Sequence, residues 1–405
     1  MQETPKGSRV HIALLGRRNA GKSSLINALT NQETALVSPV PGTTTDPVYK
    51  AMEILPMGPV MLIDTAGIDD EGQLGAMRVE KTLQVLVKTD IVLLVVDPLQ
   101  GCDSYEEKII KLCTEKSIPL LIVFNKSDLI SDEKKAALEE KYQSKNTYSY
   151  FWVSSKTQEG INQLRERLGR LKPNDHLPPS IVGDLLEPGD MVVLVVPIDS
   201  AAPKGRLILP QVQTIRDILD HQCMTVVCRE HELTKALKAL KNPPKLVVTD
   251  SQAFHQVARE TPAQVPLTSF SILMARYKGD LAILAQGAKA IDNLEPGDKV
   301  LIAEACTHHQ QHDDIGKVKI PRWLQEKVGG ELSIDFTNGF TFPGNLNEYK
   351  LVVHCGGCML NRKDMLNRIR QVENMGIPVV NYGVLIAHIH GIFPRALAPF
   401  ITLDC

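Results

Sequence analysis

Short apolar runs recur along the chain, and stretches with apolar residues at helical spacing lie between many of them. In the first part such runs lie at 10–15, 60–63, 120–124 and 151–153. Further runs lie at 192–196, 224–227, 246–248, 299–303 and 349–353, with helical patterns near 211–221, 231–240, 251–260 and 365–375. Alternation of this kind is typical of βαβ units. The pattern predicts an α/β fold with parallel sheets.

A polar, proline-rich segment at 172–180 interrupts this pattern and is typical of a semi-rigid boundary between domains. A chain of 405 residues is expected to form two or three domains at roughly 150 residues each. We predict a first domain at 7–171, a middle α/β domain at 181–265 and a last α/β domain at 266–405. The middle sequence carries no evident catalytic group, so it is a candidate for self-association.

The first apolar run leads into Gly-Arg-Arg-Asn-Ala-Gly-Lys-Ser at 16–23, and an amphipathic helix is predicted to follow. This is the phosphate loop G-x-x-x-x-G-K-[ST] in the strand–loop–helix setting that it requires. Its glycines allow a turn whose amides point at phosphate oxygens. We expect Lys22 to neutralise the β- and γ-phosphates and the Ser23 hydroxyl to reach Mg²⁺.

Two features after this loop complete a predicted magnesium and γ-phosphate site. Asp64-Thr-Ala-Gly67 follows the run at 60–63, so Asp64 is expected at a strand end behind the Mg²⁺ ion. Gly67 is expected where its amide can sense the γ-phosphate. Thr44, in the preceding Gly-Thr-Thr-Thr segment, is the candidate direct ligand of Mg²⁺.

Two further motifs predict which base is bound. Asn125-Lys-Ser-Asp128 follows the run at 120–124, and an aspartate there can accept both the N1 and N2 hydrogens of guanine. Adenine does not offer that pair of donors. Ser154-Ser155-Lys156 follows the run at 151–153 and is expected to support the same ring. The ordered motifs predict a GTPase.

These motifs resemble those of the translation-factor-related GTPases of the Era, EngA and MnmE types. The resemblance implies hydrolysis of GTP to GDP and phosphate, with Lys22, Thr44 and Gly67 acting on the phosphates and Ser23 and Thr44 holding Mg²⁺. Asn19 occupies the position that binds K⁺ in potassium-activated members, and Ile68 stands where Ras-like enzymes have a water-orienting glutamine. Turnover is therefore expected to be slow and potassium-stimulated. The expected GTP-binding residues are Gly16, Asn19, Ala20, Gly21, Lys22, Ser23, Ser24, Asp64, Asn125, Lys126, Asp128, Ser154, Ser155 and Lys156.

The last domain contains His-Cys-Gly-Gly-Cys at 354–358, and Cys-Thr-His at 306–308 precedes it. A Cys-x-x-Cys pair brings two thiolate donors onto one centre. If the runs at 299–303 and 349–353 are parallel strands, their carboxyl ends meet at one sheet edge, where such folds bind ligands. The candidate metal ligands are Cys306, Cys355 and Cys358, with His308, His354 or Glu304 near a fourth position.

Spacing alone does not identify the metal. Three cysteines and one histidine would form a closed tetrahedral zinc site. A 4Fe–4S cluster normally uses four thiolates, so three cysteines would leave one iron open or weakly held. Both zinc and an iron–sulfur cluster remain open on these residues.

The charge balance restricts the partners. Lys+Arg 45 against Asp+Glu 47 leaves no basic excess, which argues against a nucleic-acid or ribosome partner. No apolar run approaches the ~20 residues of a membrane span, and residues 1–9 are polar. We expect a cytoplasmic protein without a membrane partner. Its eight cysteines then favour metal binding or free thiols over disulfides.

A GTPase followed by Cys-x-His and His-Cys-x-x-Cys resembles, over essentially the whole chain, the HydF family of FeFe-hydrogenase maturation scaffolds. The resemblance implies a 4Fe–4S cluster on the three cysteines and a homodimer through the middle domain. It also implies that a di-iron precursor, made with two radical-SAM maturases, is accepted and delivered to the apo-hydrogenase. The alternative is a regulatory GTPase of RNA modification or ribosome assembly with a structural zinc.

Overall fold

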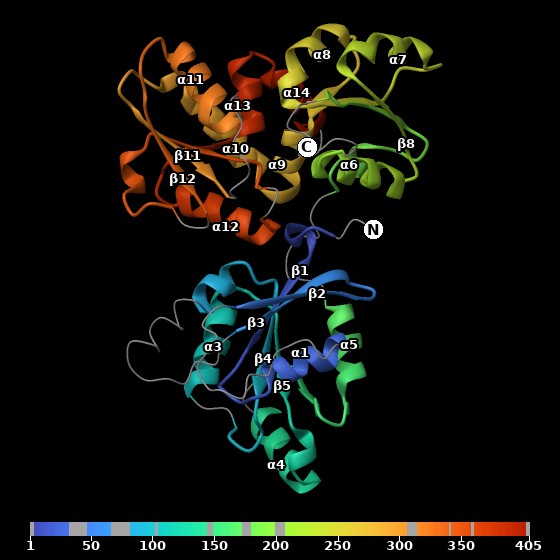
Figure 1. Cartoon of the computed structure of the whole chain (residues 1–405), viewed down its shortest axis with the longest axis vertical. Coiled ribbons are helices and arrows are strands. Elements are labelled where there is room, and N and C mark those ends of the chain that lie inside the picture. The colour runs from blue at the N-terminus through green and yellow to red at the C-terminus, as the bar shows by residue number, and fades with distance from the viewer. Residues whose placement is uncertain are drawn as a thin grey trace. The chain divides into compact units, whose positions relative to one another are not determined.

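The computed structural model describes residues 4–31, 47–65, 82–101, 104–143, 149–171, 180–198, 207–305, 314–339, 342–357 and 360–401 (Figure 1). The chain divides into two compact units, Met1–Leu177 and Pro178–Cys405. This division falls within the proline-rich segment that the sequence predicts as a boundary.

The described strands of the first unit form a six-stranded sheet in the order β2-β3-β1-β4-β5-β6. Only β2 runs antiparallel to its neighbour. The strands are β1 (Val10–Leu15), β2 (Val48–Ile54), β3 (Gly58–Asp64), β4 (Ile91–Val96), β5 (Leu120–Phe124) and β6 (Tyr150–Trp152). The helices are α1 (Lys22–Thr30), α3 (Ser104–Glu115), α4 (Asp132–Gln143) and α5 (Ile161–Arg170).

Helices cover both faces of this sheet. Successive side chains of a strand point to opposite faces, so Ile12 packs with Leu25 of α1 and Leu164 of α5, whereas Ala13 packs in a separate cluster with Ile109 of α3. This explains why β1 and β4 are apolar at almost every position. The parallel strands then bring their carboxyl ends, and the motifs that follow them, to one edge.

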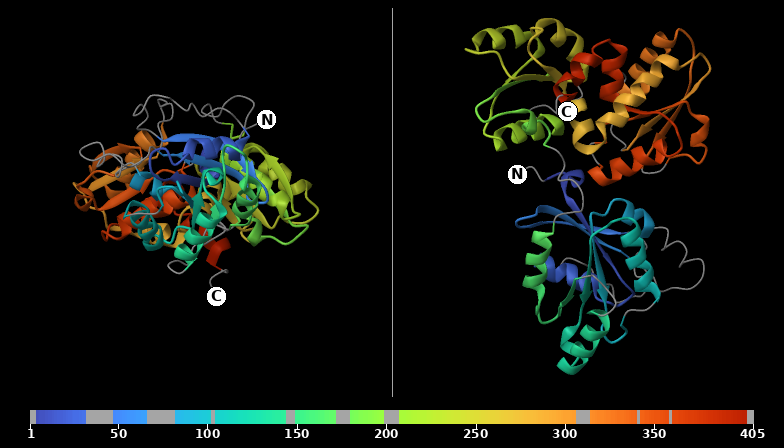
Figure 2. Two further views of the ribbon diagram at one scale, coloured as in Figure 1. Left: turned by 90° about the horizontal axis from the view of Figure 1, so that it is seen from below. Right: turned by 180° about the vertical axis from the view of Figure 1, so that it is seen from behind.

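The second unit contains two four-stranded parallel sheets in its described part, with the orders β10-β9-β7-β8 and β12-β11-β13-β14. Figure 2 shows them from two further sides. The strands are β7 (Met191–Val195), β8 (Met224–Cys228), β9 (Leu246–Thr249), β10 (Leu267–Ser269), β11 (Lys299–Glu304), β12 (Ser333–Asn338), β13 (Leu351–His354) and β14 (Val379–Asn381). The helices are α6 (Leu209–Asp220), α7 (Leu233–Ala239), α8 (Phe254–Glu260), α9 (Phe270–Lys278), α10 (Leu281–Lys289), α11 (Ile320–Val328), α12 (Arg362–Glu373), α13 (Tyr382–Ile389) and α14 (Phe393–Ile401).

The first of these sheets extends beyond residue 265, where the sequence predicts the end of the middle domain. Its strand β10 pairs in parallel with β9, and α9 follows directly. The boundary between the two sheets is therefore better drawn after α9. The predicted edge misses this because β10 is only three residues long and carries a weak apolar signal.

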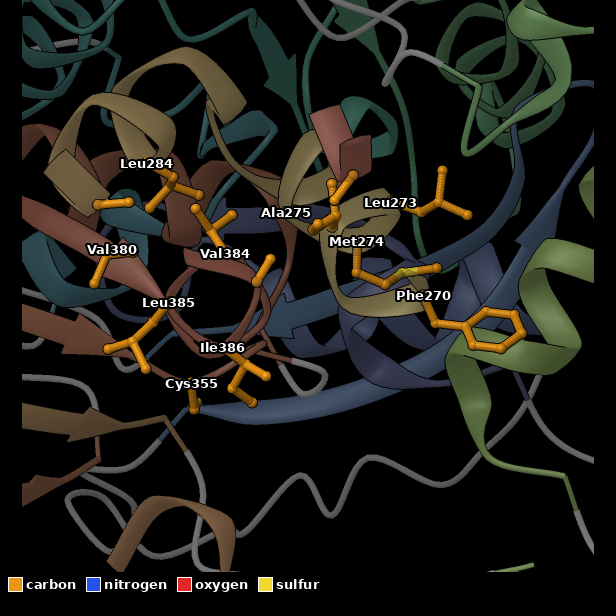
Figure 3. Close-up of a cluster of buried hydrophobic side chains, with 14 of the residues drawn as sticks. Phe270, Leu273, Met274, Ala275, Leu284, Cys355, Val380, Val384, Leu385 and Ile386 are labelled. Carbon is orange, nitrogen blue, oxygen red and sulfur yellow. The ribbon is translucent and has the colours of Figure 1, made fainter. Parts of the chain in front are cut away.

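One hydrophobic cluster joins both sheets of the second unit. Figure 3 shows part of it, where Phe270 and Leu273 of α9 lie with Val384 and Ile386 of α13, and Cys355 belongs to the same cluster. Since apolar side chains from both halves share one core, α9 is embedded between them.

Candidate functional site

The phosphate loop lies between β1 and α1, and both of its glycines are required by close packing. A Cβ on Gly16 would lie 2.2 Å from the carbonyl oxygen of Val95 in β4. Gly21 has a φ of +89°, and a Cβ there would lie 2.2 Å from Nδ2 of Asn125. The loop is thus held between the neighbouring strand and the base-recognition motif, and only glycine fits at either position.

Two side chains that follow the second glycine of the loop make defined contacts. Lys22 is buried and its Nζ donates to the carbonyl oxygens of Gly16 at 2.8 Å and Arg17 at 2.7 Å. The Ser23 hydroxyl donates to Oδ2 of Asp64 at 2.5 Å. Burial raises the pKa of Asp64, while the Ser23 hydrogen bond and the charges of Lys22 and Lys50 oppose that rise. A divalent cation beside Ser23 and Asp64 would favour the ionised carboxylate.

The base-recognition residues form one hydrogen-bonded group at the ends of β5 and β6. Nδ2 of Asn125 donates to the carbonyl oxygen of Ala20 at 3.1 Å. Oδ1 of Asn125 accepts two hydrogen bonds from Ser155, one from its hydroxyl at 2.9 Å and one from its backbone N–H at 3.1 Å. The Ser154 hydroxyl donates to Oδ1 of Asp128 at 2.7 Å. Asp128 is exposed, so its carboxylate is accessible to a base edge. The structure brings the phosphate loop and both base motifs together.

Two ion pairs in this region were not predicted from the sequence. Lys126 donates to Oδ2 of Asp97 at 2.7 Å, and Asp97 follows β4 directly. Arg17, inside the phosphate loop, donates to Oε2 of the buried Glu106 on α3 at 2.9 Å. Neither carboxylate belongs to a recognised motif. The one sequence signal that could have indicated Asp97 is its position directly after the apolar residues of β4.

The remaining predicted site residues are either exposed or outside the described residues. Asn19, Ser24 and Lys156 are exposed, and Asn19 adopts a left-handed φ of 61° that turns the loop. Thr44, Gly67 and Ile68 lie outside the described residues, so their expected roles stay predictions.

The cysteine-containing segments follow two neighbouring parallel strands of the second unit. β11 pairs with β13, and Ala303 lies opposite His354 in the register. Directly beyond these strands, the backbone N–H of Ala305 donates to Sγ of Cys355 at 3.2 Å, and Cys355 is 8% exposed. The carboxyl ends of the runs at 299–303 and 349–353 therefore meet at one edge, as the sequence predicts. Cys306, His308 and Cys358 lie outside the described residues.

Both ring nitrogens of His354 make hydrogen bonds in the described structure, and its place among the candidate ligands stays a prediction. Its Nδ1 lies 2.7 Å from the carbonyl oxygen of Cys355, and its Nε2 accepts from Nε of Arg368 at 2.8 Å. A carbonyl only accepts and a guanidinium only donates, so the hydrogen is on Nδ1 and both ring nitrogens are engaged. Burial, followed by the charge of Arg368, lowers the pKa of His354 to about 4 and keeps the ring neutral.

Arg368 is itself buried beside this histidine. It is 3% exposed, donates to the carbonyl oxygen of Gly339 at 3.2 Å and stacks over the Phe342 ring with its Cζ 4.4 Å from the centroid. Burial lowers the pKa of Arg368, whereas Asp364 and Cys355 oppose that shift. A fixed cation therefore lies within electrostatic reach of the Cys355 sulfur.

A buried carboxylate lies on the same sheet edge. Glu304, the last residue of β11, is 5% exposed, and its Oε1 accepts from the Tyr382 hydroxyl at 3.2 Å. A Cβ on Gly316 would lie 2.7 Å from that Oε1, so the carboxylate is closely surrounded. Of the fourth-position candidates, Glu304 is the one whose oxygen lies at this edge in the described residues.

The described residues fit a thiolate-bound metal group in their chemistry. Cys355 is a buried thiol that accepts a backbone hydrogen bond, and the guanidinium of Arg368 favours negative charge near it. Within the described ranges no three His, Cys, Asp or Glu side chains come together as a metal site, and Cys306 and Cys358 lie outside those ranges.

Family comparisons connect these features. Residues 181–279 match the family model "Hydrogen maturase F dimerization domain". Residues 282–399 match "Hydrogen maturase F tetramerization domain", directly after the first match. The chain belongs to the HydF family. Residues 11–126 match the model "50S ribosome-binding GTPase", so this HydF-type chain carries a GTPase domain in its first unit. Both hydrogen maturase F domains support oligomerisation of the chain.

Curated relatives match this HydF-type chain over its GTPase part. GTPase Der of Sulfurihydrogenibium sp. is 37% identical over 172 residues, which is 40% of this chain and 38% of that protein. The tRNA modification GTPase MnmE of Nitrosospira multiformis is 36% identical over 160 residues, 39% of this chain and 34% of that protein. The chain thus spans less than two fifths of these relatives. A solved structure of Era is 21% identical with a TM-score of 0.36, covering 54% of this chain and 93% of that chain.

A search of the helices in the described parts of this HydF-type chain finds none that is long and apolar enough to cross a membrane.

Proposed function

We propose that the chain hydrolyses GTP in its first unit and holds a 4Fe–4S cluster on Cys306, Cys355 and Cys358 in its last domain. In this proposal it accepts the di-iron precursor of a hydrogenase active site from radical-SAM maturases and delivers it to apo FeFe-hydrogenase in the cytoplasm. The observation that supports it most is the pairing of β11 with β13 in a HydF-type chain, because it directs the segments carrying these cysteines to one edge.

The nucleotide part of the proposal rests on the phosphate loop and on the contacts of Lys22 and Ser23. Lys22 would neutralise the β- and γ-phosphates, and Ser23 and Thr44 would hold Mg²⁺, with Asp64 accepting a hydrogen bond from the Ser23 hydroxyl in the described structure. Gly67 donates its amide to the γ-phosphate. Asn19 holds K⁺ beside the phosphates, so hydrolysis is faster in K⁺ than in Na⁺. The Asn125 and Asp128 group gives the site its preference for guanine.

The metal part rests on the thiol edge and its surroundings. When bound, a cluster with three thiolate ligands offers one iron whose remaining ligand exchanges readily, which suits a carrier that must release its cargo. Arg368 fixes the orientation of His354 through its Nε2. His308, His354 and Glu304 are the candidates for the fourth position.

Self-association completes the proposal. In the described sheet β8 is an edge strand, and Met224 and Val227 on it are 53% and 44% exposed. Leu219 at the end of α6 is 55% exposed. Exposed apolar side chains beside an unpaired strand edge favour pairing with another chain. We propose that a homodimer forms through this edge of the dimerization domain.

The central test separates the two sites. Wild type, Lys22→Ala, Cys355→Ser and Cys223→Ser are purified without oxygen, reconstituted with iron and sulfide, and compared by iron content, electron paramagnetic resonance and GTP turnover. Cys223 is a buried thiol of the middle sheet region and serves as the matched control. Lys22→Ala is expected to lose turnover and keep its cluster. Cys355→Ser is expected to lose the cluster and keep turnover, and Cys223→Ser to keep both.

Two results would reject the proposal. One zinc per chain with no cluster after reconstitution would favour the regulatory GTPase with a structural zinc. Loss of both properties in Lys22→Ala and in Cys355→Ser would mean that the sites are not separable. Delivery itself is measured by mixing the loaded chain with apo-hydrogenase and following hydrogen evolution, with the Cys355→Ser chain expected to give none.

A further inference from the structure

Helix α9 connects the two sheets of the second unit. It begins directly after β10, where the Ser269 side chain accepts from the backbone N–H of Ile272 and caps the helix. Along its length it packs against α6 of the first sheet and against α12 and α13 of the second. Because close-packed cores deform little, a displacement of α9 would displace the helices that pack on it from both sheets of the unit.

The last residue of α9 holds the loop that follows Cys355. Lys278 is only 2% exposed, and its Nζ donates to the carbonyl oxygens of Gly357 at 3.2 Å and Leu360 at 3.0 Å. A buried ammonium needs hydrogen-bond acceptors around it, and here the cysteine loop supplies two of them. Gly357 has a left-handed φ of +57°, a conformation that glycine adopts readily.

A second basic residue of α9 contacts the start of the unit. Arg276 donates through Nη1 to Oδ1 of Asp184 at 2.9 Å and to the carbonyl oxygen of Ser180 at 3.2 Å, and Nη2 pairs with the other Asp184 oxygen. Ser180 is the first described residue after 172–179, the segment that continues from the GTPase part of the chain. Residues two apart on a helix point to nearly opposite sides, so Arg276 and Lys278 reach these two regions from opposite sides of α9.

The end of α9 is also fixed to the helix that follows the cysteine loop. Nη1 of Arg362, the first residue of α12, lies 3.2 Å from the carbonyl oxygen of Arg276 and 3.3 Å from that of Gly279. It also donates to the carbonyl oxygen of Tyr277. The carboxyl end of α9 and both ends of the cysteine loop thus form one hydrogen-bonded assembly.

We propose that α9 couples the exit of the interdomain segment to the cysteine loop, with Lys278 as the positioning residue of the loop and the Arg276–Asp184 pair as its anchor. A shift at Ser180 and Asp184 moves Arg276, and α9 carries that movement to the carbonyls that Lys278 holds. That this coupling transmits the GTP- or GDP-bound state of the first unit to the cysteine loop rests on the function proposed above. The coupling itself does not depend on bound metal.

The test measures how readily the buried Cys355 thiol is alkylated in the full chain as purified, without nucleotide or metal reconstitution. Peptide-resolved mass spectrometry follows iodoacetamide labelling of Cys355, with the buried Cys113 of the first unit as internal reference. The variants are Lys278→Met, Asp184→Asn and Arg276→Gln. Glu348→Gln is the matched control, since Glu348 makes a surface ion pair with Lys299 in the same unit.

Lys278→Met is expected to raise the Cys355 labelling rate roughly tenfold or more, because hydrogen bonds from a charged donor are lost. Asp184→Asn and Arg276→Gln are each expected to raise the Cys355 labelling rate by roughly threefold or more. The double variant should raise it no further than the larger single effect, because both changes break the same ion pair. Cys113 labelling and the Glu348→Gln chain should stay unchanged.

Unchanged Cys355 labelling in Asp184→Asn and Arg276→Gln would overturn the coupling, even if Lys278→Met did not fold. Unchanged labelling in a folded Lys278→Met chain would overturn the positioning role. Because the measurement needs no iron, a failure here is distinct from a failure to bind the cluster.

Discussion

The stability of the GTPase unit is expected to depend on pH through His11 in β1. This side chain is 7% exposed, and its Nδ1 lies 3.0 Å from the carbonyl oxygen of Arg9, so it donates there in the neutral ring. The pKa of His11 is lowered from 6.5 to about 4, mainly by burial; the Arg9 hydrogen bond opposes this shift and the charge of Lys88 adds to it. The folded unit therefore excludes a proton that the unfolded chain binds.

The sign and size follow from this difference. Below pH 6.5 His11 of the unfolded chain binds a proton, whereas His11 of the folded chain stays neutral until about pH 4. The free energy of unfolding therefore falls as the pH drops from 6.5 to about 4. The contribution is complete above pH 6.5 and amounts to roughly 3 kcal/mol over the whole window. Between pH 7.5 and pH 5 the loss is roughly 2 kcal/mol.

The assay uses one tryptophan as a reporter of the first unit. The chain has two tryptophans, and in a Trp323→Phe background the fluorescence reports on Trp152. Trp152 stacks on Phe124 with centroids 4.6 Å apart and donates to Glu139, so its signal changes when this unit unfolds. Urea unfolding at pH 7.5 and pH 5 is compared with and without His11→Asn, whose amide can still donate to the Arg9 carbonyl.

His11→Asn should lose roughly 2 kcal/mol less on acidification than the parent chain. Contributions of all other titrating groups, including Asp64, are common to both chains and cancel in that comparison. Equal losses in the two chains would refute the assignment of this pH dependence to His11.

Three further outcomes are expected. Gly21→Ala should weaken GDP binding more than tenfold in a fluorescent-nucleotide titration, because its Cβ would meet Asn125 in a left-handed backbone; unchanged affinity would contradict the geometry. Asp128→Asn should shift the competition from guanosine toward xanthosine nucleotides, since an amide can donate to the xanthine oxygen; retained guanine preference would place base recognition elsewhere. Met224→Glu should move the chain toward a smaller assembly in analytical ultracentrifugation, whereas Leu129→Glu, exposed in the first unit, should not; equal effects would exclude the β8 edge.

The sequence predicts those parts of the fold and site that short local segments determine. The apolar runs became strands, and several of them, such as β1 and β4, are buried on both faces. The phosphate loop was recognisable because its glycines and lysine lie within eight residues of one another. The parallel pairing of β11 with β13 was predictable for the same reason. Three-residue β10 carried too little pattern to be recognised, and the middle sheet was expected to end before it.

The orientation of a side chain that depends on distant residues could not be predicted. His354 was a reasonable ligand candidate by its place beside Cys355, but Arg368, 14 residues later, engages its second nitrogen. Lys278 lies 79 residues before the Gly357 carbonyl that it holds. Nothing in the spacing of cysteines and histidines indicates either contact.

Both unexpected residues are buried cations, and that shared property has a physical reason. Lysine and arginine are rarely buried, so sequence reasoning assigns them to the surface by default. A region that concentrates negative charge on thiolates gains stability when fixed positive charge lies close to it without adding a competing ligand, and ammonium and guanidinium groups are donors that do not bind metals in their charged forms. Lys278 supports the backbone of the cysteine loop, and Arg368 acts on the Cys355 sulfur and fixes His354. The cysteines leave both zinc and an iron–sulfur cluster open, whereas these cations would favour a group of negative charge at this edge.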